Sequence, residues 1–345
     1  MALSNAWTFG QTNAAGDAQS LFLKVSTGEL ITAFRRKSVT EDRFRTKTIS
    51  GGKSGQFKVT SRTQPIGHER ADAIDEDANA TSEASPTYGV ANDYLDNMKV
   101  AEIDVGIDRA LTRGFFFDEL DEAMDPLSPQ LRQEATFSVG EAIARTVDRR
   151  RLINLSQGAI ASGYNTDMPS GVDITEANIF SVAADTLDAL ADLAGQFDDN
   201  EVPMEGRMLF VRPADKYWMV SNLRDSVINR DYGGAGSVAG GTIPEIMGFE
   251  IISTTNLPYR TNVSTVPEGS STVHSLNDYI VDNSTVNCIA GHRESLGVLQ
   301  LTPFTGGPQA MVIEQKRRLG EIIGAKWYGG SKFLRPEACG VIRTA

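Results

Sequence analysis

Residues 128–158 read SPQLRQEATFSVGEAIARTVDRRRLINLSQG, and apolar side chains recur at every fourth position of this stretch. The recurring residues are Leu131, Ala135, Val139, Ile143 and Val147. Such spacing places them on one face of an α-helix. Ser128 suits the N-cap, and Pro129 suits the first helical position, where a missing N–H costs nothing. The pattern predicts a helix over residues 129–156, about 42 Å long at about 1.5 Å per residue.

Downstream of this helix the pattern is mixed. The long helix is expected to end at Ser156 and Gly158, and a second amphipathic helix is expected between Thr175 and Gly195. A third helix is predicted to open at Pro213. Short apolar runs predict strands at residues 208–211, 249–252, 279–281 and 286–289. Helices and strands mix without regular βαβ alternation, which predicts an α+β fold.

Upstream, the sequence predicts a long excursion from the body. Residues 44–49 and 56–60 alternate polar and apolar side chains, as strands do, and the glycine-rich residues 50–55 predict a turn between them. Residues 66–93 lack a period and are rich in Asp, Glu, Ala, Ser and Thr, as in a loop. A returning strand is predicted from the alternation of Val100, Ile103, Val105 and Ile107. Together these segments indicate an extended arm that leaves the body and returns to it.

Charge is distributed unevenly along the chain. The 345 residues include 33 Lys and Arg against 45 Asp and Glu, a net charge of −12. This sign argues against a protein whose main role is to bind phosphates. Residues 35–70 carry a net +7, from ten basic and three acidic residues, whereas residues 71–125 carry −12, from three and fifteen. Two interpretations stay open: two solvated faces of one subunit, which charge alone favours, or segments that meet opposite charges on neighbouring copies.

Two glycine-rich segments resemble nucleotide-binding motifs without fulfilling them. Gly52-Lys53-Ser54 resembles the end of a phosphate-binding loop, but Lys47 stands where that motif requires glycine. A predicted strand also follows it, where the motif requires a helix. The glycines of residues 233–241 have the wrong spacing for a dinucleotide fingerprint, and no predicted strand precedes them. A turn and a surface loop are the better interpretations.

The titratable residues form no recognisable site. The three histidines, His68, His274 and His292, are scattered, and no hydrolase, zinc-protease or calcium-loop motif is present. Cys288 and Cys339 have the spacing of neither a zinc site nor a disulfide framework, and we expect both to be buried thiols in a reducing compartment. The sequence therefore predicts no catalytic, cofactor-binding or metal-ligating residues. We also expect no signal peptide and no membrane span, because no basic segment precedes an apolar run and no run approaches about 18 residues.

The order of segments resembles the Hong Kong 97 capsid fold: a mobile tail, a short arm, an extended two-stranded loop, a long helix and a compact α+β domain. Short stretches are similar to the major capsid proteins of T-seven-like short-tailed double-stranded DNA phages (podoviruses, autographiviruses). These are Leu21–Val25, Gly28–Phe34, Ile49-Ser50 with Gly52-Lys53-Ser54 and Gln56-Phe57, Met247–Glu250, His292-Arg293 and Leu334–Ala338. The resemblance covers nearly the whole chain after about residue 20, and is lost at residues 66–93 and 256–276.

This resemblance implies a structural protein, not an enzyme. It would self-assemble as pentamers and hexamers into an icosahedral shell that encloses the double-stranded DNA genome of a phage. The implied divisions are an N-terminal arm at 1–50, an extended loop at 51–105, a peripheral domain at 106–172 and 306–345 that carries the spine helix, and an axial domain at 173–305. Further implied are a scaffolding protein during assembly, a portal protein at one vertex, and a place in the virion capsid after assembly in the host bacterial cytoplasm. Two alternatives stay open, a soluble α+β enzyme with an unrecognised site and a non-viral encapsulating shell protein of the same fold.

In a shell, the basic segment 35–70 and the acidic segment 71–125 would be candidate partners between neighbouring subunits. A head-to-tail interface that closes into rings needs two different complementary patches. We expect the tip of the extended loop to lie on an adjacent subunit, with acidic residues facing basic ones. The candidate contact residues are Asp72, Asp75, Glu76 and Asp77 at the tip, and Arg35, Arg36 and Lys37 of a neighbouring arm.

Overall fold

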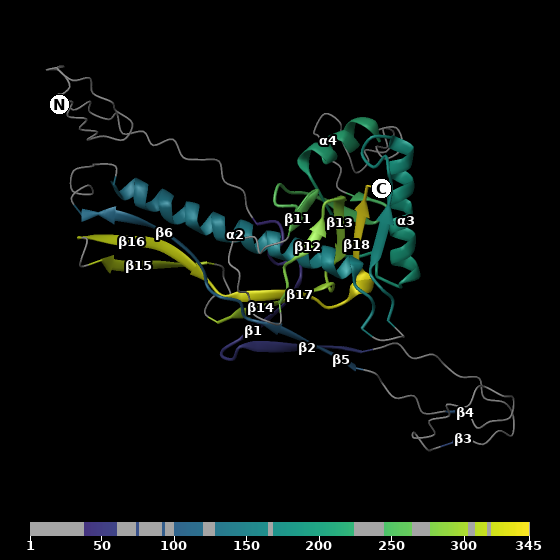
Figure 1. Cartoon of the computed structure of the whole chain (residues 1–345), viewed down its shortest axis with the longest axis horizontal. Helices are drawn as coiled ribbons and strands as arrows, with labels where there is room; N and C mark the ends of the chain where they lie inside the picture. The colour runs from purple at the N-terminus through teal and green to yellow at the C-terminus, as the bar shows by residue number, and fades with distance from the viewer. Residues whose placement is uncertain are drawn as a thin grey trace.

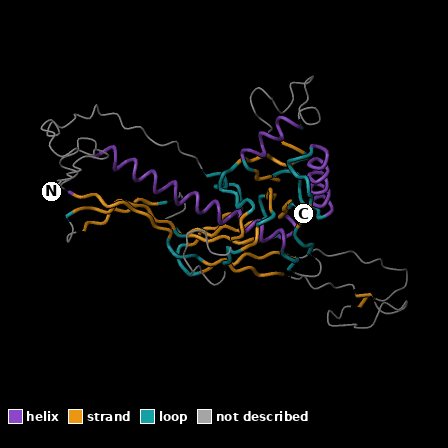
Figure 2. The backbone as a smooth tube through the Cα atoms, turned by 45° about the horizontal axis from the view of Figure 1, so that its top comes forward, coloured by secondary structure: helices purple, strands orange, loops and turns teal. Residues whose placement is uncertain are grey.

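The computed structural model describes residues 38–60, 74–75, 92–93, 100–119, 128–164, 168–223, 245–263, 277–302, 308–315 and 319–344. Helix α2 (Ser128–Ile160, 33 residues) runs through this elongated molecule and connects its parts (Figure 1). A three-stranded sheet lies along its N-terminal half, and a six-stranded sheet lies at its C-terminal end (Figure 2).

The three-stranded antiparallel sheet has the order β15–β16–β6 and packs against α2 through one face. Its strands are β6 (Leu111–Asp118), β15 (Gln309–Gln315) and β16 (Gly320–Trp327). Val139, Ile143 and Val147 of the predicted helix stripe are buried in one cluster with Ala325 and Trp327 of β16. The predicted helix and the predicted side of its apolar face are therefore confirmed.

The end predicted for this helix was wrong by one turn. Helix α2 passes through Ser156 and Gly158 and stops at Ile160. Ser156 is accommodated because its Oγ donates to the Ile153 carbonyl within the helix. Gly158 is accommodated because α2 lies very close to strand β18: a Cβ at this position would stand 2.7 Å from Cys339 Sγ. Here glycine serves close packing and does not terminate the helix.

The six-stranded mixed sheet has the order β7–β18–β13–β8–β10–β9. Its strands are β7 (Val172–Thr175), β8 (Arg207–Val211), β9 (Glu245–Ile246), β10 (Phe249–Ser253), β13 (Val286–His292) and β18 (Cys339–Arg343). Alternate side chains of β8 point to opposite layers. Leu209 joins the cluster of helices α3 (Ala183–Asp199) and α4 (Pro213–Asn222), whereas Phe210 joins Leu152 and Leu155 of α2. The sheet is thus covered on both faces, and α2 belongs to both parts of the body.

The bounds predicted for the second helix were also wrong. Helix α3 begins at Ala183, after a turn that follows Thr175, and continues past Gly195 to Asp199. Gly195 lies on the exposed side of the helix, where a missing side chain does not interrupt packing. The helix continues because Phe197, in its last turn, is fully buried against the sheet.

The extended arm is confirmed at its base. Strands β2 (Ser54–Thr60) and β5 (Val100–Gly106) pair antiparallel from Ser54↔Gly106 to Thr60↔Val100 and lie along the body beside β14 (Leu296–Leu301) (Figure 1). Phe57, Val59, Ile103 and Val105 of this pair are buried in one cluster with Leu299 and Leu334. The short strands β3 (Ile74–Asp75) and β4 (Asn92–Asp93) pair farther along the chain. The rest of the predicted loop tip, the N-terminal tail and residues 233–241 lie outside the described residues.

The strand predicted over residues 44–49 is confirmed as β1 (Arg45–Ile49). It pairs in parallel with β14, which also pairs with β17 (Gly329–Phe333). The strand predicted over residues 279–281 changes in the structure. Of residues 279–281 only Val281 is in a strand, β12 (Val281–Asn283), which pairs with β11 (Thr261–Val263). Tyr279 precedes β12 because its ring and hydroxyl group enter a polar network beneath α2.

Candidate functional site

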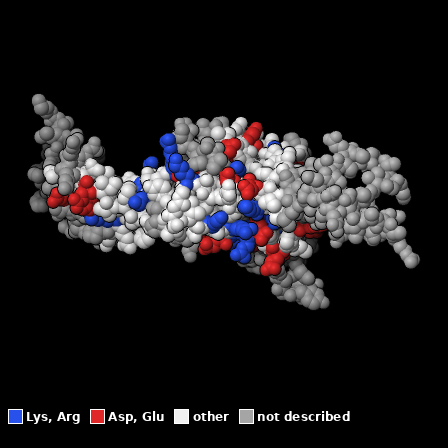
Figure 3. Space-filling view, turned by 90° about the horizontal axis from the view of Figure 1, so that it is seen from below, with Lys and Arg blue, Asp and Glu red and all other residues white. Residues whose placement is uncertain are grey.

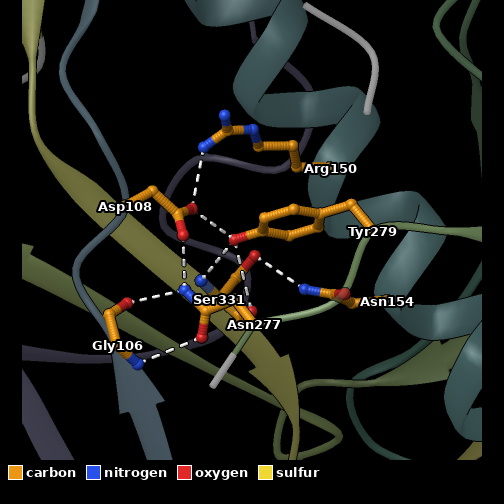
Figure 4. A network of polar contacts seen from close by, with 7 residues as sticks. All are labelled: Gly106, Asp108, Arg150, Asn154, Asn277, Tyr279 and Ser331. Atoms are coloured by element: carbon orange, nitrogen blue, oxygen red, sulfur yellow. Dashed lines mark hydrogen bonds and ion pairs between the residues drawn. The ribbon is translucent and has the colours of Figure 1, made fainter. Parts of the chain in front are cut away.

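A buried polar network holds the base of the β2–β5 arm beneath helix α2 (Figure 4). Asp108, which follows β5, is only 4% exposed. Its Oδ2 lies 2.8 Å from Arg150 Nη1 of α2 and accepts a hydrogen bond of 2.7 Å from the Tyr279 hydroxyl. Its Oδ1 accepts a hydrogen bond of 2.7 Å from Asn277 Nδ2. Asp108 therefore joins the arm, the long helix and the segment before β12.

The same network fixes the last residue of the arm through its backbone. Asn277 Oδ1 accepts from the Gly106 N–H at 3.0 Å, and Asn277 Nδ2 donates to the Gly106 carbonyl at 2.7 Å. Strand β17 passes so close that a Cβ at Gly330 would lie 2.0 Å from the Gly106 carbonyl oxygen. The Ser331 N–H donates to the Tyr279 hydroxyl, and its Oγ accepts from Asn154 of α2. The arm thus leaves the body from a closely packed point.

A second buried carboxylate, that of Asp148 on the same turn of α2 as Arg150, holds residues 38–40. Asp148 is 1% exposed and accepts from the Ser38 hydroxyl at 2.5 Å and from the Val39 N–H at 3.0 Å. It also accepts from the N–H and the hydroxyl of Thr40. Arg151 Nη1 donates to the Thr40 carbonyl at 2.9 Å. Residues 38–40 are thereby fixed to the long helix before the chain enters β1.

The chemistry of these groups favours structure over catalysis. Burial and the negative charge of Asp108 raise the pKa of Tyr279, so its hydroxyl stays protonated and donates. Burial raises the pKa of both Cys288 and Cys339, which keeps the thiols neutral and unreactive. Burial is also the main cause that lowers the pKa of His292, whose Nε2 lies 2.9 Å from the Glu205 carbonyl. Within the described part of the chain, no three His, Cys, Asp or Glu side chains are grouped as metal ligands.

A wide-open groove of about 340 Å³ lies at the C-terminal end of α2. Its lining residues include Gln157, Ile160, Ile280, Lys332 and Phe333. They combine apolar side chains with an amide and an amine, and the Asp278 carboxylate also lines the groove; no Ser, Thr or Cys nucleophile is among the lining residues. The groove therefore resembles a surface depression more than an active site.

The face of the three-stranded sheet that points away from α2 carries an exposed apolar row. Phe116, Ile322 and Ile313 stand directly opposite one another on β6, β16 and β15, so they share one face. Ala325 and Trp327 of β16 point to the other face, against α2. Phe116 is 42% and Ile313 41% exposed. Apolar side chains grouped at the surface in this way mark candidate interaction sites.

Basic side chains gather on the same side of the molecule, over β1 and β2 (Figure 3). The exposed residues there are Arg45, Lys47, Lys53 and Lys58. Lys58 pairs with Glu102 at 3.1 Å, and both side chains remain more than half exposed. The described part of the basic segment is thus presented to the surface, where a partner can reach it.

The predicted contact residues stay predictions. Arg35, Arg36, Lys37, Asp72, Glu76 and Asp77 lie outside the described residues. The backbone of Asp75 pairs with Asp93 between β3 and β4, while its side chain is not described.

Sequence reasoning missed the buried charges around α2. One signal was present: Asp148, Arg150 and Arg151 immediately precede Leu152 and Leu155, where the helix face becomes fully buried. Charged residues at the margin of a buried face are seldom left unpaired. This signal indicates that residues 148–151 of the helix need polar partners, but it does not identify Asp108 and Thr40 as those partners.

Comparisons with known proteins point to one class of protein. A family model described as "Gp10A-like: Major capsid protein" matches residues 83–343. The chain is 26% identical over 350 residues to the major capsid protein of Escherichia phage T7, covering 95% of this chain and 93% of that protein. It is also 26% identical over 360 residues to the major capsid protein of Enterobacteria phage T3, covering 96% and 94%.

Solved structures agree on the fold. The capsid structure of the cyanophage P-SCSP1u superposes with a TM-score of 0.75 at 26% identity, covering 95% of this chain and 94% of that chain. The mature capsid of bacteriophage PhiM1 superposes with a TM-score of 0.70 at 14% identity, covering 93% and 91%. Among the described residues, no helix has the length and apolar character that crossing a membrane requires.

Proposed function

The chain belongs to the Gp10A-like family of major capsid proteins, and we propose that its subunits assemble as pentamers and hexamers into an icosahedral shell around double-stranded DNA. It has the Hong Kong 97-type fold and is a structural component of a phage capsid. The observation that carries the proposal is the extent of the similarity, which covers 95% of this chain in both the T7 relative and the cyanophage capsid. These relatives favour a phage shell over a non-viral shell or an enzyme.

The proposal includes a domain organisation of the subunit. Residues 1–50 would form the N-terminal arm, 51–105 the extended loop, 106–172 with 306–345 the peripheral domain, and 173–305 the axial domain. The two domains share more than a linker, because β18 near the C-terminus pairs with β13 and with β7 in the six-stranded sheet. Assembly in the host bacterial cytoplasm with a scaffolding protein, and a portal protein at one vertex, complete the proposal.

The apolar row supports self-association. A subunit with Phe116 and Ile313 exposed gains free energy when a second copy covers them, because about 25 cal/mol is released per Å² of apolar surface buried. The row lies on a face that α2 leaves uncovered, so covering it requires no change in the subunit's own core.

Replacing both Phe116 and Ile313 by serine is expected to weaken assembly without unfolding the subunit. Each inter-subunit contact that uses the row should lose about 1–2 kcal/mol, a factor of about 5–30 in its equilibrium constant. Sedimentation of assembly mixtures, together with thermal melts of the free subunit, measures both effects. The matched control is Phe116→Leu with Ile313→Val, which keeps the row apolar and should assemble as the parent does. Normal assembly of the serine variant would remove the row from the proposed interface.

Neutralising the acidic tip tests the proposed electrostatic contact. With Asp72, Asp75 and Asp77 changed to Asn and Glu76 to Gln, the free subunit should keep its circular dichroism spectrum and its melting temperature. Each exposed pair contributes only about 0–1 kcal/mol, but every subunit of the shell repeats it, so assembly should slow. Raising the salt concentration on the unmodified chain should act in the same direction by screening. Shells that form at the parent rate and resist heat equally would mean that the two charged segments are solvated faces.

A further inference from the structure

The two buried carboxylates, Asp148 of α2 and Asp108 after β5, meet α2 within residues 148–150. Each takes part in attaching a separate extension of the chain to the body. Asp148 holds residues 38–40, and Arg150, two positions later, holds Asp108 at the base of the β2–β5 arm. Both carboxylates are almost fully buried. Residues 38–40 and 108 are distant in sequence, yet each depends on a charged side chain within residues 148–151.

Side chains connect the two attachment points into one contiguous set. The Arg150 guanidinium lies 4.9 Å from the centre of the Tyr279 ring, whose hydroxyl bonds Asp108. Arg151 donates a hydrogen bond to Thr40, and together with Arg150, Tyr279 and Ser331 it lines a gap that is too small for a water molecule. Burial lowers the pKa of Arg151, while the charge of Asp148 is the largest influence that opposes this. The charge and position of Arg151 therefore depend on Asp148 and Thr40, the residues through which the segment 38–40 is attached.

We propose that residues 148–151 of α2 form a joint that couples the direction of the β2–β5 arm to the attachment of residues 38–40. Asp108, Asp148, Arg150 and Arg151 are positioning residues in this joint. On the arm they act together with an apolar contact, in which Phe57, Val59, Ile103 and Val105 are buried against Leu299 and Leu334. The bearing of the joint on shell assembly rests on the proposed function, whereas the coupling itself belongs to the free subunit.

The physical reason for coupling is the cost of a buried charge that loses its partner. If residues 38–40 detach, Asp148 loses hydrogen bonds from Ser38, Val39 and Thr40 at once and keeps only the long one from Asn256 Nδ2, at 3.4 Å. A buried ion that loses most of its partners is strongly destabilising, so α2 must shift or admit water at this turn. Either change moves Arg150, which lies two residues away and holds Asp108. Buried polar networks respond as a unit for this reason.

The test perturbs one extension and observes the other, in the unassembled full-length chain. Thr40→Val removes the hydroxyl that bonds Asp148 and Arg151 while it keeps the side-chain shape. Spin labels at Gln56→Cys on β2 and Asp192→Cys on α3, both exposed positions, report the direction of the arm relative to the body. Cys288 and Cys339 are buried and should not take label. Thr48→Val, at an exposed position of β1, is the matched control.

We expect Thr40→Val to broaden the distribution of distances between the two labels and Thr48→Val to leave it narrow. Amide exchange of Gly106, whose N–H is bonded by Asn277, should accelerate about tenfold, as expected for loss of one hydrogen bond to a charged group. Exchange in β8 and β13 should not change, which separates the effect from a general loss of stability. Reciprocally, Tyr279→Phe should accelerate exchange of the Val39 amide, because coupling between two sites acts in both directions.

The proposal is wrong if Thr40→Val accelerates amide exchange only at residues 38–40. In that case the label distances and the exchange rate of Gly106 would equal those of the control. Should Thr40→Val not fold, Ser38→Ala removes a single hydrogen bond to Asp148 and is read in the same way. All measurements use the free subunit, so their outcome is independent of whether the chain forms a shell.

Discussion

Asp108→Ala is expected to lower the free energy of unfolding of the subunit by about 3–5 kcal/mol, the usual cost of breaking a buried ion pair from one side. The change leaves the Arg150 guanidinium buried without its carboxylate at 2.8 Å, and it removes the acceptor of Tyr279 and Asn277. Denaturant unfolding of the unassembled subunit measures the loss as a shift of the midpoint. No surface ion pair in the described structure is expected to have a comparable effect.

The matched control is Glu102→Ala on β5, the same strand that leads to Asp108. Glu102 also forms an ion pair, with Lys58, but both side chains are more than half exposed, so its loss should cost about 0–1 kcal/mol. If Asp108→Ala and Glu102→Ala shift the midpoint equally, the polar network does not anchor the arm.

Val139→Asp is expected to prevent the subunit from folding to a soluble form. Val139 is 1% exposed and packs between α2 and the three-stranded sheet, beside Ala325 and Trp327. A carboxylate there has no cationic partner in its cluster, and an unpaired buried charge costs several kcal/mol, a large fraction of the stability of a typical domain. The expected result is insoluble or degraded protein, measured as the soluble fraction after expression.

The neighbouring substitution Ser138→Asp provides the comparison for this variant. Ser138 lies on the exposed side of the same helical turn, and the added charge should be solvated with little effect. A soluble, assembling Val139→Asp subunit would mean that the apolar face of α2 is assigned to the wrong side.

Local periodicity explains which parts of the fold were predictable. The four-residue recurrence of Val139, Ile143 and Val147 predicted the long helix and its buried face, and alternation predicted β2 and the returning strand β5. These signals are strong because each element buries one face along most of its length. The similarity of short stretches to phage capsid proteins supplied the order of the parts.

The missed features depend on contacts between residues distant in sequence. Strand β6 reads LTRGFFFD, whose consecutive aromatic residues do not alternate, because both faces of the strand carry apolar side chains. The parallel pairing of β1 with β14 joins residues 45–49 to 297–301, and no local turn signals it. Asp108 and Arg150 appear in the sequence as ordinary surface charges, since only the folded chain shows that both are buried. The helix ends were misplaced because neither glycine ends its helix. Gly158 allows close packing against β18, and Gly195 lies on an exposed side of its helix.

Electron cryomicroscopy of particles formed by the chain, expressed together with the scaffolding protein that we propose for it, tests the central claim most directly. We predict closed icosahedral shells built of hexamers and pentamers of this subunit, with α2 and the three-stranded sheet arranged as in the free chain. A folded chain that yields only monomers or small discrete oligomers under these conditions would contradict the account.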